Sequence, residues 1–342
     1  MKKPVTLYIL LLALSIGVLF LLNLFLGSVD IPFRSIWNIL WGMDEGESVI
    51  WQNIIWKSRV PQALTAMVAG AGLAVSGLQM QTVFRNPLAG PSVLGISSGA
   101  SLGVAFVVLL SGSIGGIALS RLGFMGEIAL TMAAIIGALS IMALIVYVSQ
   151  KVHGNVTLLI IGVMIGYVAN AVIGVLKFFS VEEDIRAYVI WGLGSFARVS
   201  GNQMMVFVCI MAVLLPLSFL LIKTLNLLLL GDAYARNLGL NIKRARLQVI
   251  ACSGVLVAIV TAYCGPITFL GLAVPHLCRG IFRSSDHRIL MPASLLAGAA
   301  LALLCNLDSP NARIRRGIAC QLSDGFSRCT GGRFGAVQET TQ

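Results

Sequence analysis

Long apolar runs alternate with short polar segments along most of this chain. The nine runs lie at residues 5–26, 61–84, 92–110, 126–149, 156–179, 204–222, 248–263, a short one ending near 275–276, and 289–304. About 20 apolar residues in a helix cross the hydrocarbon core of a bilayer. The pattern therefore predicts an all-α polytopic membrane protein with nine spanning helices in one membrane domain, residues 1–306.

The second run is rich in small residues and ends in a polar break. Gly70, Ala74 and Gly77 recur at helical spacing, which lets neighbouring helix backbones approach closely inside a membrane. We expect the break to be a hinge at the cytoplasmic face. Its three residues are Arg85, Asn86 and Pro87.

The composition supports a membrane protein, and this affects how the positive net charge is interpreted. Hydrophobic residues make up 58% of the 342, charged residues 11%, and mean hydropathy is +0.93. The formal net charge is +11. In a soluble protein it would suggest a nucleic-acid partner, whereas here it indicates basic loops beside anionic membrane lipid. The seven cysteines form no CxxC pair and indicate no metal site.

The distribution of basic residues predicts an orientation. Lys2 and Lys3 precede the first run and place the amino terminus in the cytoplasm. The loops on that side hold roughly twice as many Lys and Arg residues as the opposite loops, as the positive-inside rule requires. We therefore expect a multi-pass protein of the inner, cytoplasmic membrane with a cytoplasmic amino terminus.

Motifs for enzyme chemistry are missing from the sequence. It contains no GxxxxGK[ST] phosphate-binding loop, so it is not expected to bind ATP itself. The runs hold almost no ionisable residues, which argues against an ion-coupled carrier. The polar residues Gln79, Tyr167 and Asn170 could line a transport pathway or serve as hydrogen-bond partners between helices.

A polar insert at residues 225–247 interrupts the apolar pattern. It predicts a short helix over 232–237, Gly239 as its C-cap and a second helix starting at Asn241. Two helices at a sharp turn would form a compact knob that binds a partner. The alternative is a basic interfacial loop that contacts lipid headgroups.

Together, these residues resemble the permease subunits of type II ABC importers, which move iron–siderophores, haem and vitamin B12. The resemblance covers residues 5–306. Its motifs are RVP at 59–61, RNPLAGPSVLGISSGA at 85–100, WGLGS at 191–195, GDAYARNLGL at 231–240, GPITFLGLAVPHLCR at 265–279 and SDHRILMPAS at 285–294.

The resemblance implies a subunit of about ten helices that forms a homodimer around a central pathway. It also implies two separate ATP-binding cassette subunits, which hold ATP and Mg, and a periplasmic or lipid-anchored substrate-binding protein. The residues expected to couple to the ATPase are Gly231, Asp232, Ala235, Arg236, Gly239 and Leu240. Arg59 matches a docking position for the binding protein. Gln62 stands where the family often has a second arginine, so we expect docking either to be weaker or to use Lys57 as well.

The resemblance predicts import of a metal chelate by alternating access, with a ferric siderophore as the first choice and haem or cobalamin as others. An ion-coupled secondary transporter is the alternative. Residues 307–342 depart from the family as a basic tail without a spanning run. Codons read one nucleotide later can encode a family-like last helix, so we expect a frameshift here.

Overall fold

The computed structural model describes residues 3–27, 29–43, 48–115, 123–152, 155–199 and 201–311, which form helices and no strands. The first seven helices are α1 (Lys3–Phe25), α2 (Phe33–Leu40), α3 (Val49–Ile54), α4 (Val60–Phe84), α5 (Ile96–Gly115), α6 (Gly123–Lys151) and α7 (Asn155–Phe178). The others are α8 (Glu182–Gly192), α9 (Gly201–Phe219), α10 (Ile222–Leu229), α11 (Asp232–Asn237), α12 (Ile242–Cys264), α13 (Leu270–Phe282) and α14 (His287–Asn311).

Seven helices of the described ranges are long and apolar enough to cross a membrane. They are Val5–Phe25, Val49–Phe84, Met125–Lys151, Thr157–Phe178, Gly201–Phe219, Ile242–Cys264 and His287–Leu307. Two further predicted runs form shorter apolar helices, at Ile96–Leu110 and Leu270–Phe282. The all-helical, multi-span class is thus confirmed, whereas the count of nine full-length spans is not. The predicted tail lies almost entirely outside the described residues, which end at Asn311.

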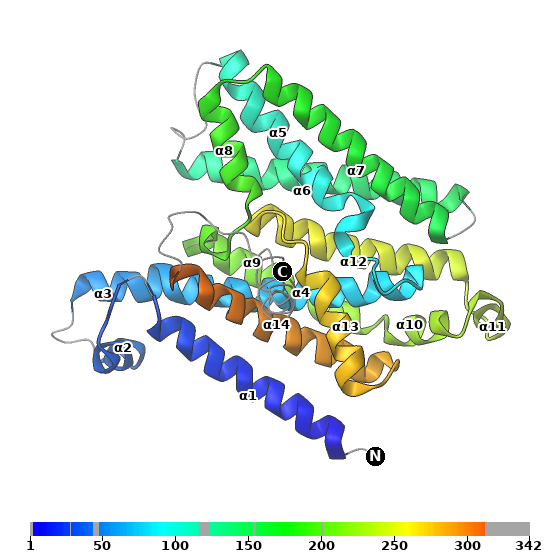
Figure 1. The fold of residues 1–342 in the computed structure, drawn as a ribbon, viewed down its shortest axis with the longest axis horizontal. Helices are drawn as coiled ribbons and strands as arrows, with labels where there is room; N and C mark the ends of the chain where they lie inside the picture. Colours follow the sequence, from blue (N-terminus) through cyan, green and yellow to red (C-terminus); the bar gives the residue numbers. More distant parts are fainter. Residues whose placement is uncertain are drawn as a thin grey trace, which may run out of the picture.

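Helix α4 is the central element of the bundle (Figure 1). It packs against α14, α12, α13 and α9. A Cβ added to Gly70 would overlap the carbonyl oxygen of Gly298 on α14, and a Cβ added to Gly77 would overlap that of Gly271 on α13. The small-residue face predicted from Gly70, Ala74 and Gly77 therefore does bring helix backbones into contact.

Helix α13 does not end near Pro275, as the sequence pattern suggested, but continues to Phe282. Proline has no backbone N–H, so the helical bond from residue 275 to the carbonyl of Gly271 cannot form. That carbonyl faces Gly77 of α4. Packing against α4 thus keeps α13 helical through a residue that would otherwise favour its end.

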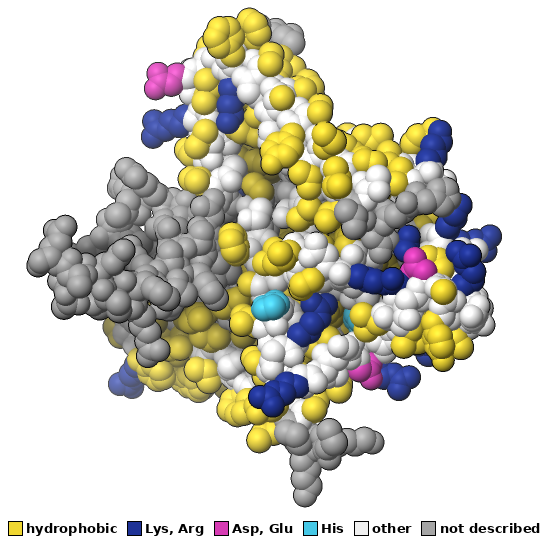
Figure 2. Space-filling view, turned by 45° about the vertical axis from the view of Figure 1, so that its right-hand side comes forward, with side chains coloured by type: hydrophobic (Ala, Val, Ile, Leu, Met, Phe, Trp, Pro, Cys, Tyr) yellow, Lys and Arg dark blue, Asp and Glu magenta, His cyan; other side chains and the backbone are white. Residues whose placement is uncertain are grey.

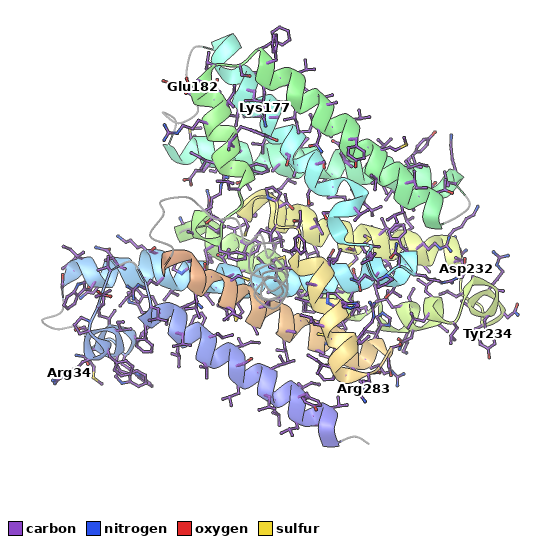
Figure 3. All side chains as sticks on the ribbon, viewed as in Figure 1. Arg34, Lys177, Glu182, Asp232, Tyr234 and Arg283 are labelled. Carbon is purple, nitrogen blue, oxygen red and sulfur yellow. The ribbon has the colours of Figure 1, made fainter. Side chains whose placement is uncertain are left out.

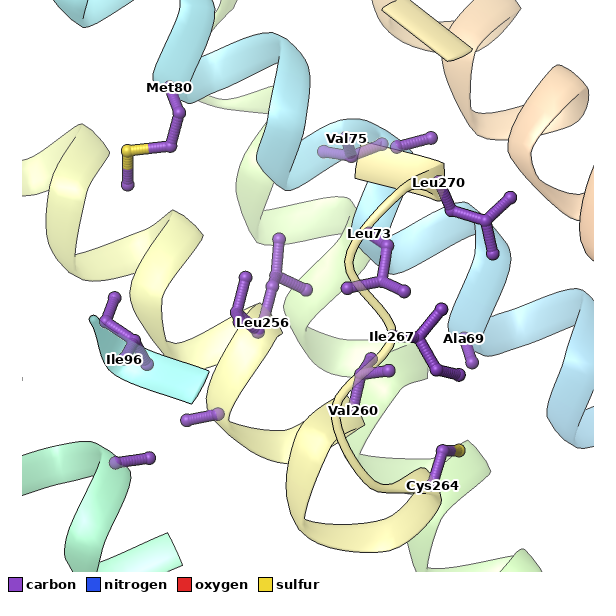
Figure 4. Close-up of a cluster of buried hydrophobic side chains, with 14 of the residues drawn as sticks. Ala69, Leu73, Val75, Met80, Ile96, Leu256, Val260, Cys264, Ile267 and Leu270 are labelled. Atoms are coloured by element: carbon purple, nitrogen blue, oxygen red, sulfur yellow. The ribbon is translucent and has the colours of Figure 1, made fainter. Parts of the chain in front are cut away.

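The core lies between α4, α12 and the segment that leads into α13. Figure 4 shows Leu73 of α4 beside Leu256 and Val260 of α12, with Ile267 and Leu270 closing the cluster. All five side chains are buried. This core holds α12 against α4 and fixes the positions of their ends.

The bundle has two opposite ends, which we name by the residues that flank α4. Helices α2 and α3 lie at the Arg59 end, whereas α11 lies at the Arg85 end (Figure 1). In Figure 3, Arg34 marks the first end and Asp232 and Tyr234 mark the second. The amino terminus lies on the same side as the Arg85 end. This arrangement agrees with the predicted grouping of the hinge, the insert and the amino terminus.

Candidate coupling site at the Arg85 end

The segment between α10 and α12 forms a short helix bracketed by glycines. Gly231 and Gly239 have φ angles of 101° and 84°, a backbone region that favours glycine. The N–H of Leu240 donates to the carbonyl of Ala235 at 3.0 Å, which is the outer bond of a Schellman C-cap. The Asn241 side chain accepts a backbone N–H at 3.1 Å and caps α12. Both helix starts and the C-cap predicted from the sequence are confirmed.

One face of α11 packs inward and the other is exposed. Ala235 is fully buried, whereas Tyr234 and Leu238 are 59% and 55% exposed. Of the six residues predicted to couple to an ATPase, Ala235 therefore faces the bundle and anchors α11 instead of contacting a partner. Helical spacing explains the difference, because residues four apart share a face. Tyr234 and Leu238 form the outward apolar pair.

Asp232, the first residue of α11, is held by two arginines from distant segments. One carboxylate oxygen pairs with Arg85 at the end of α4, and the other pairs with Arg246 on α12. The Arg85 guanidinium also donates to the carbonyl of Leu228 on α10 at 3.2 Å. Three helices thus meet at one carboxylate, which we call the Asp232 clamp, formed by Asp232, Arg85 and Arg246.

The predicted hinge follows α4 directly. Arg85 has φ 48°, in the left-handed region, and it ends the helix. The side-chain oxygen of Asn86 accepts a hydrogen bond from the N–H of Leu88 at 2.9 Å. This bond closes a local turn that has Pro87 at its centre. The hinge prediction placed the end of α4 correctly. It did not predict the contact that Arg85 makes with the insert.

A second polar cluster joins α4, α10 and α14 beside the clamp. His287 Nδ1 lies 2.8 Å from Asn226 Oδ1, and His287 Nε2 lies 2.8 Å from the hydroxyl of Thr82. The Asn226 amide nitrogen donates to Asp286 at 2.7 Å, so the amide oxygen is the atom facing the ring. Nδ1 then carries the proton, because an oxygen can only accept. The cluster fixes the start of α14 on α4.

Gln81 provides a further link between α4 and α13 at this end. Its amide nitrogen donates to the carbonyl of Leu272 at 3.1 Å, and its oxygen accepts a hydrogen bond from Arg279. Gln81 is buried. The last two turns of α4 are therefore bonded to α10, α11, α13 and α14.

Arg59, at the other end of α4, is buried and does not form an exposed docking rim. Its guanidinium donates to the carbonyls of Leu24 at 2.6 Å and Phe25 at 3.2 Å, and also to that of Val29. Carbonyls at a helix end have no partner within the helix, and α1 ends here with Arg59 as its cap. Lys57 is exposed and remains the predicted docking residue at this end.

The three predicted pathway residues do not share a surface in one chain. Gln79 is buried against α12, where its amide nitrogen lies 3.9 Å from the sulfur of Cys252. Tyr167 and Asn170 are exposed on α7. Gln79 thus fits the role of a hydrogen-bond partner between helices, whereas Tyr167 and Asn170 remain predictions for a pathway.

The sequence patterns missed residues whose partners lie far away along the chain. No motif or spacing in the sequence singles out Arg246 or Asn226. The signal that could have found Tyr234 and Leu238 is their spacing of four, since Leu238 directly follows the predicted helix 232–237. Within the described ranges, His, Cys, Asp and Glu form no group that could hold a metal ion.

Comparison with known proteins places this geometry in a family. A model of the FecCD transport family matches residues 13–311. The chain is a member of the FecCD transport family. Two relatives are the haemin transport system permease protein of Yersinia pestis, 37% identical over 81% of this chain and 79% of the relative, and the vitamin B12 import system permease protein of Klebsiella pneumoniae, 36% identical over 74% and 72%.

A solved structure gives the same fold for this FecCD chain. It is an inward-facing conformation of a metal-chelate type ABC transporter, 28% identical, with a TM-score of 0.78 over 95% of this chain and 98% of that chain. The helices that carry the Asp232 clamp all lie within the range matched to the family.

Proposed function

We propose that this chain is the permease subunit of an ATP-driven importer that moves a metal chelate across the inner membrane. The observation that carries the proposal is α11, a short helix tied by the Asp232 clamp to the ends of α4 and α12. Its outer face presents Tyr234 and Leu238 at the Arg85 end. The FecCD membership and the names of the haemin and vitamin B12 relatives support this assignment.

The proposed assembly contains two copies of this chain, two ATP-binding cassette subunits and a substrate-binding protein. ATP and Mg belong to the cassette subunits, since this chain has no phosphate-binding loop in its sequence. The binding protein docks at the Arg59 end, where Lys57 is exposed. The stoichiometry and the docking residue are both part of the proposal.

The clamp suggests how closure of the ATPase pair reaches the membrane helices. A displacement of α11 pulls on Asp232, and the two arginines pass it to α4 and α12. Because α4 packs against α13 and α14, these two helices move with it. This coupling is the basis of the alternating access that we propose, in which ATP shifts the balance between outward- and inward-open states.

The proposed substrate class is a metal held in a large organic chelate. The relatives are named for haemin and vitamin B12, both of which are metal macrocycles. Import of a ferric siderophore, the first choice from the sequence, remains a prediction. Uptake assays with haemin, cobalamin and a ferric siderophore, each with its own binding protein, distinguish the three.

Co-purification tests the assignment to an ABC importer. A cassette ATPase should remain with this chain in detergent, and the pair Tyr234→Ala and Leu238→Ala should weaken the association roughly tenfold because contact residues at an interface core carry most binding energy. Leu220→Ala is the matched control, since Leu220 is 74% exposed outside α11. Substrate uptake that continues without any ATPase subunit would overturn the proposal and favour an ion-coupled carrier.

We infer separately that the tail arises from a shifted reading frame. The family match ends at Asn311, and residues 312–342 lie beyond it. The nucleotide sequence is the direct test: a stop codon in the next frame, or no apolar helix encoded there, contradicts the inference.

A further inference from the structure

A cavity of about 350 Å³ lies behind α11, between the start of α12, the end of α6 and the start of α7. This volume falls within the range of about 300–1,000 Å³ that holds small organic ligands. The cavity sits where the long apolar helices α6, α7 and α12 begin or end, so it lies at the depth of the lipid headgroups when these helices span a membrane.

The mouth of the cavity is positively charged. Arg236, Lys243 and Arg246 line it together with one carboxylate, that of Asp232. Both Asp232 oxygens are already paired, with Arg85 and with Arg246. Within the described residues, no carboxylate lies within ion-pair distance of Arg236 or Lys243. The positive charges of Arg236 and Lys243 therefore face the cavity without a carboxylate partner.

The floor of the same cavity is apolar. Val83, Leu158 and Ile250, from α4, α7 and α12, line it and are buried. Figure 2 shows basic side chains gathered over this end of the molecule beside yellow apolar surface. A ligand that fills the cavity must combine a negative charge with an apolar stem. Free inorganic anions meet only the first requirement.

We propose that this cavity binds the phosphate-bearing headgroup of an anionic phospholipid, with the start of an acyl chain on the apolar floor. Basic pockets between membrane helices on the cytoplasmic side bind such headgroups. The phosphate lies between Arg236 and Lys243 and leaves the Asp232 clamp intact. Bound there, the lipid joins α11 to α6, α7 and α12, and it holds the insert against the bundle.

This site depends on the chain spanning a membrane and is independent of which substrate it carries. Its consequence is that anionic lipid stabilises the position of α11. The ATPase-binding face, Tyr234 and Leu238, lies on α11 itself and does not line the cavity. Arg236 is also among the residues expected to couple to the ATPase, whereas Lys243 is not, so a substitution of Lys243 is the one that separates lipid binding from ATPase binding.

The test is lipid retention by the full chain in phosphatidylcholine nanodiscs doped with phosphatidylglycerol. The cavity pair R236Q and K243Q is compared with the control pair K223Q and R244Q, which removes the same charge from the same end outside the cavity. We expect the cavity pair to lose affinity for phosphatidylglycerol by roughly tenfold or more, at about 1 kcal/mol per basic residue near a membrane surface. The control pair should retain it.

Further measurements distinguish a lipid site from surface charge and from a site for a free anion. If both pairs lose affinity for phosphatidylglycerol equally, the lipid is attracted to the charged surface in general, and the proposal is overturned. It is also overturned if neither pair loses affinity. Thermal protection by inorganic phosphate or glycerol 3-phosphate equal to that by phosphatidylglycerol assigns the cavity to a free anion and also overturns it. If the cavity pair fails to fold in phosphatidylcholine alone, retention of phosphatidylglycerol is instead compared between the single variant K243Q and the charge-preserving pair R236K and K243R. K243Q should retain less phosphatidylglycerol than the parent, whereas the pair R236K and K243R should retain as much.

Discussion

The two ends of α4 each carry an arginine, and the structure uses them in opposite ways. Arg59 is 7% exposed and its guanidinium donates to carbonyls at and beyond the end of α1. Arg85 is 41% exposed at its side chain and pairs with the carboxylate of Asp232. The buried arginine replaces backbone partners that α1 cannot provide. The exposed one makes an ionic contact, which costs little free energy to break because solvent screens it.

The largest effect is expected from substituting Arg59, which should lower the stability of the protein. Arg59→Ala should lower the free energy of unfolding by about 3 kcal/mol, because buried carbonyls lose a charged donor. The melting temperature in detergent should fall by roughly 6–12 °C. Lys57→Ala, two residues away and exposed, should change it little. A fall of similar size in both variants would contradict the capping role of Arg59.

At the Arg85 end the expected effect is on transport and not on folding. Asp232→Asn should reduce ATP-driven uptake roughly tenfold, the size of a typical coupling between sites. The melting temperature should stay within about 2 °C of the parent, because exposed ion pairs add little stability. Glu182→Gln, at the Arg59 end (Figure 3), serves as the control. Normal uptake by Asp232→Asn would show that the clamp does not transmit motion.

A smaller effect is expected from salt, which should weaken the contact at the Arg85 end of α4 and not the one at the Arg59 end. In a double-mutant cycle, Arg85→Ala and Asp232→Ala should show a coupling energy of about 0.5–1 kcal/mol at low salt. Screening should remove most of it near 1 M salt, where the Debye length is about 3 Å. The destabilisation caused by Arg59→Ala should not depend on salt. A coupling energy that is unchanged by salt would argue against an ionic contact at the clamp.

The smallest effect concerns acid, again at the Arg85 end. Hydrogen bonds from the backbone N–H of Arg288 lower the pKa of Asp286, whose carboxylate precedes α14. A carboxyl with a lowered pKa in the fold stabilises it above its unfolded pKa of about 3.9, and the contribution is lost as pH falls below that value. The difference in melting temperature between the parent and Asp286→Asn should therefore shrink as pH drops from about 6 to about 3. A constant difference across that range would exclude this carboxylate as the cause.

Local signals in the sequence predicted the insert well. Gly239 and Asn241 each act on the backbone of their immediate neighbours, so their cap chemistry is readable without tertiary information. The apolar runs likewise predicted the membrane helices, although the apolar part of α5, Ile96–Leu110, and the whole of α13 are shorter than a full span. The end of α13 was predicted wrongly because the helix continues through Pro275 to Phe282, with Gly271 packed against Gly77 of α4.

Contacts between distant segments could not be predicted in this way. Asp232 meets Arg85 and Arg246 only after α4, α10 and α12 have packed together, and no spacing along the chain encodes that meeting. The burial of Arg59 has the same origin, because its carbonyl partners lie 35 residues away, as with Leu24, or 30, as with Val29. The sequence thus singled out Arg85 and Asp232, and neither Arg246 nor the bonds between them.

Gly70 faces the backbone of Gly298 and the Cβ of Ala302 on α14, and Gly77 faces the backbone of Gly271 on α13, so neither contact involves a side chain longer than a methyl group. Seven residues, about 10 Å of helix rise, separate the two contacts along α4. Side chains at an interface can absorb a small displacement by changing rotamer, whereas a peptide group within a helix has no such freedom. A push on the Arg85 end of α4 would therefore reach α13 and α14 undiminished, as motion is passed between rigid rods that touch at fixed points.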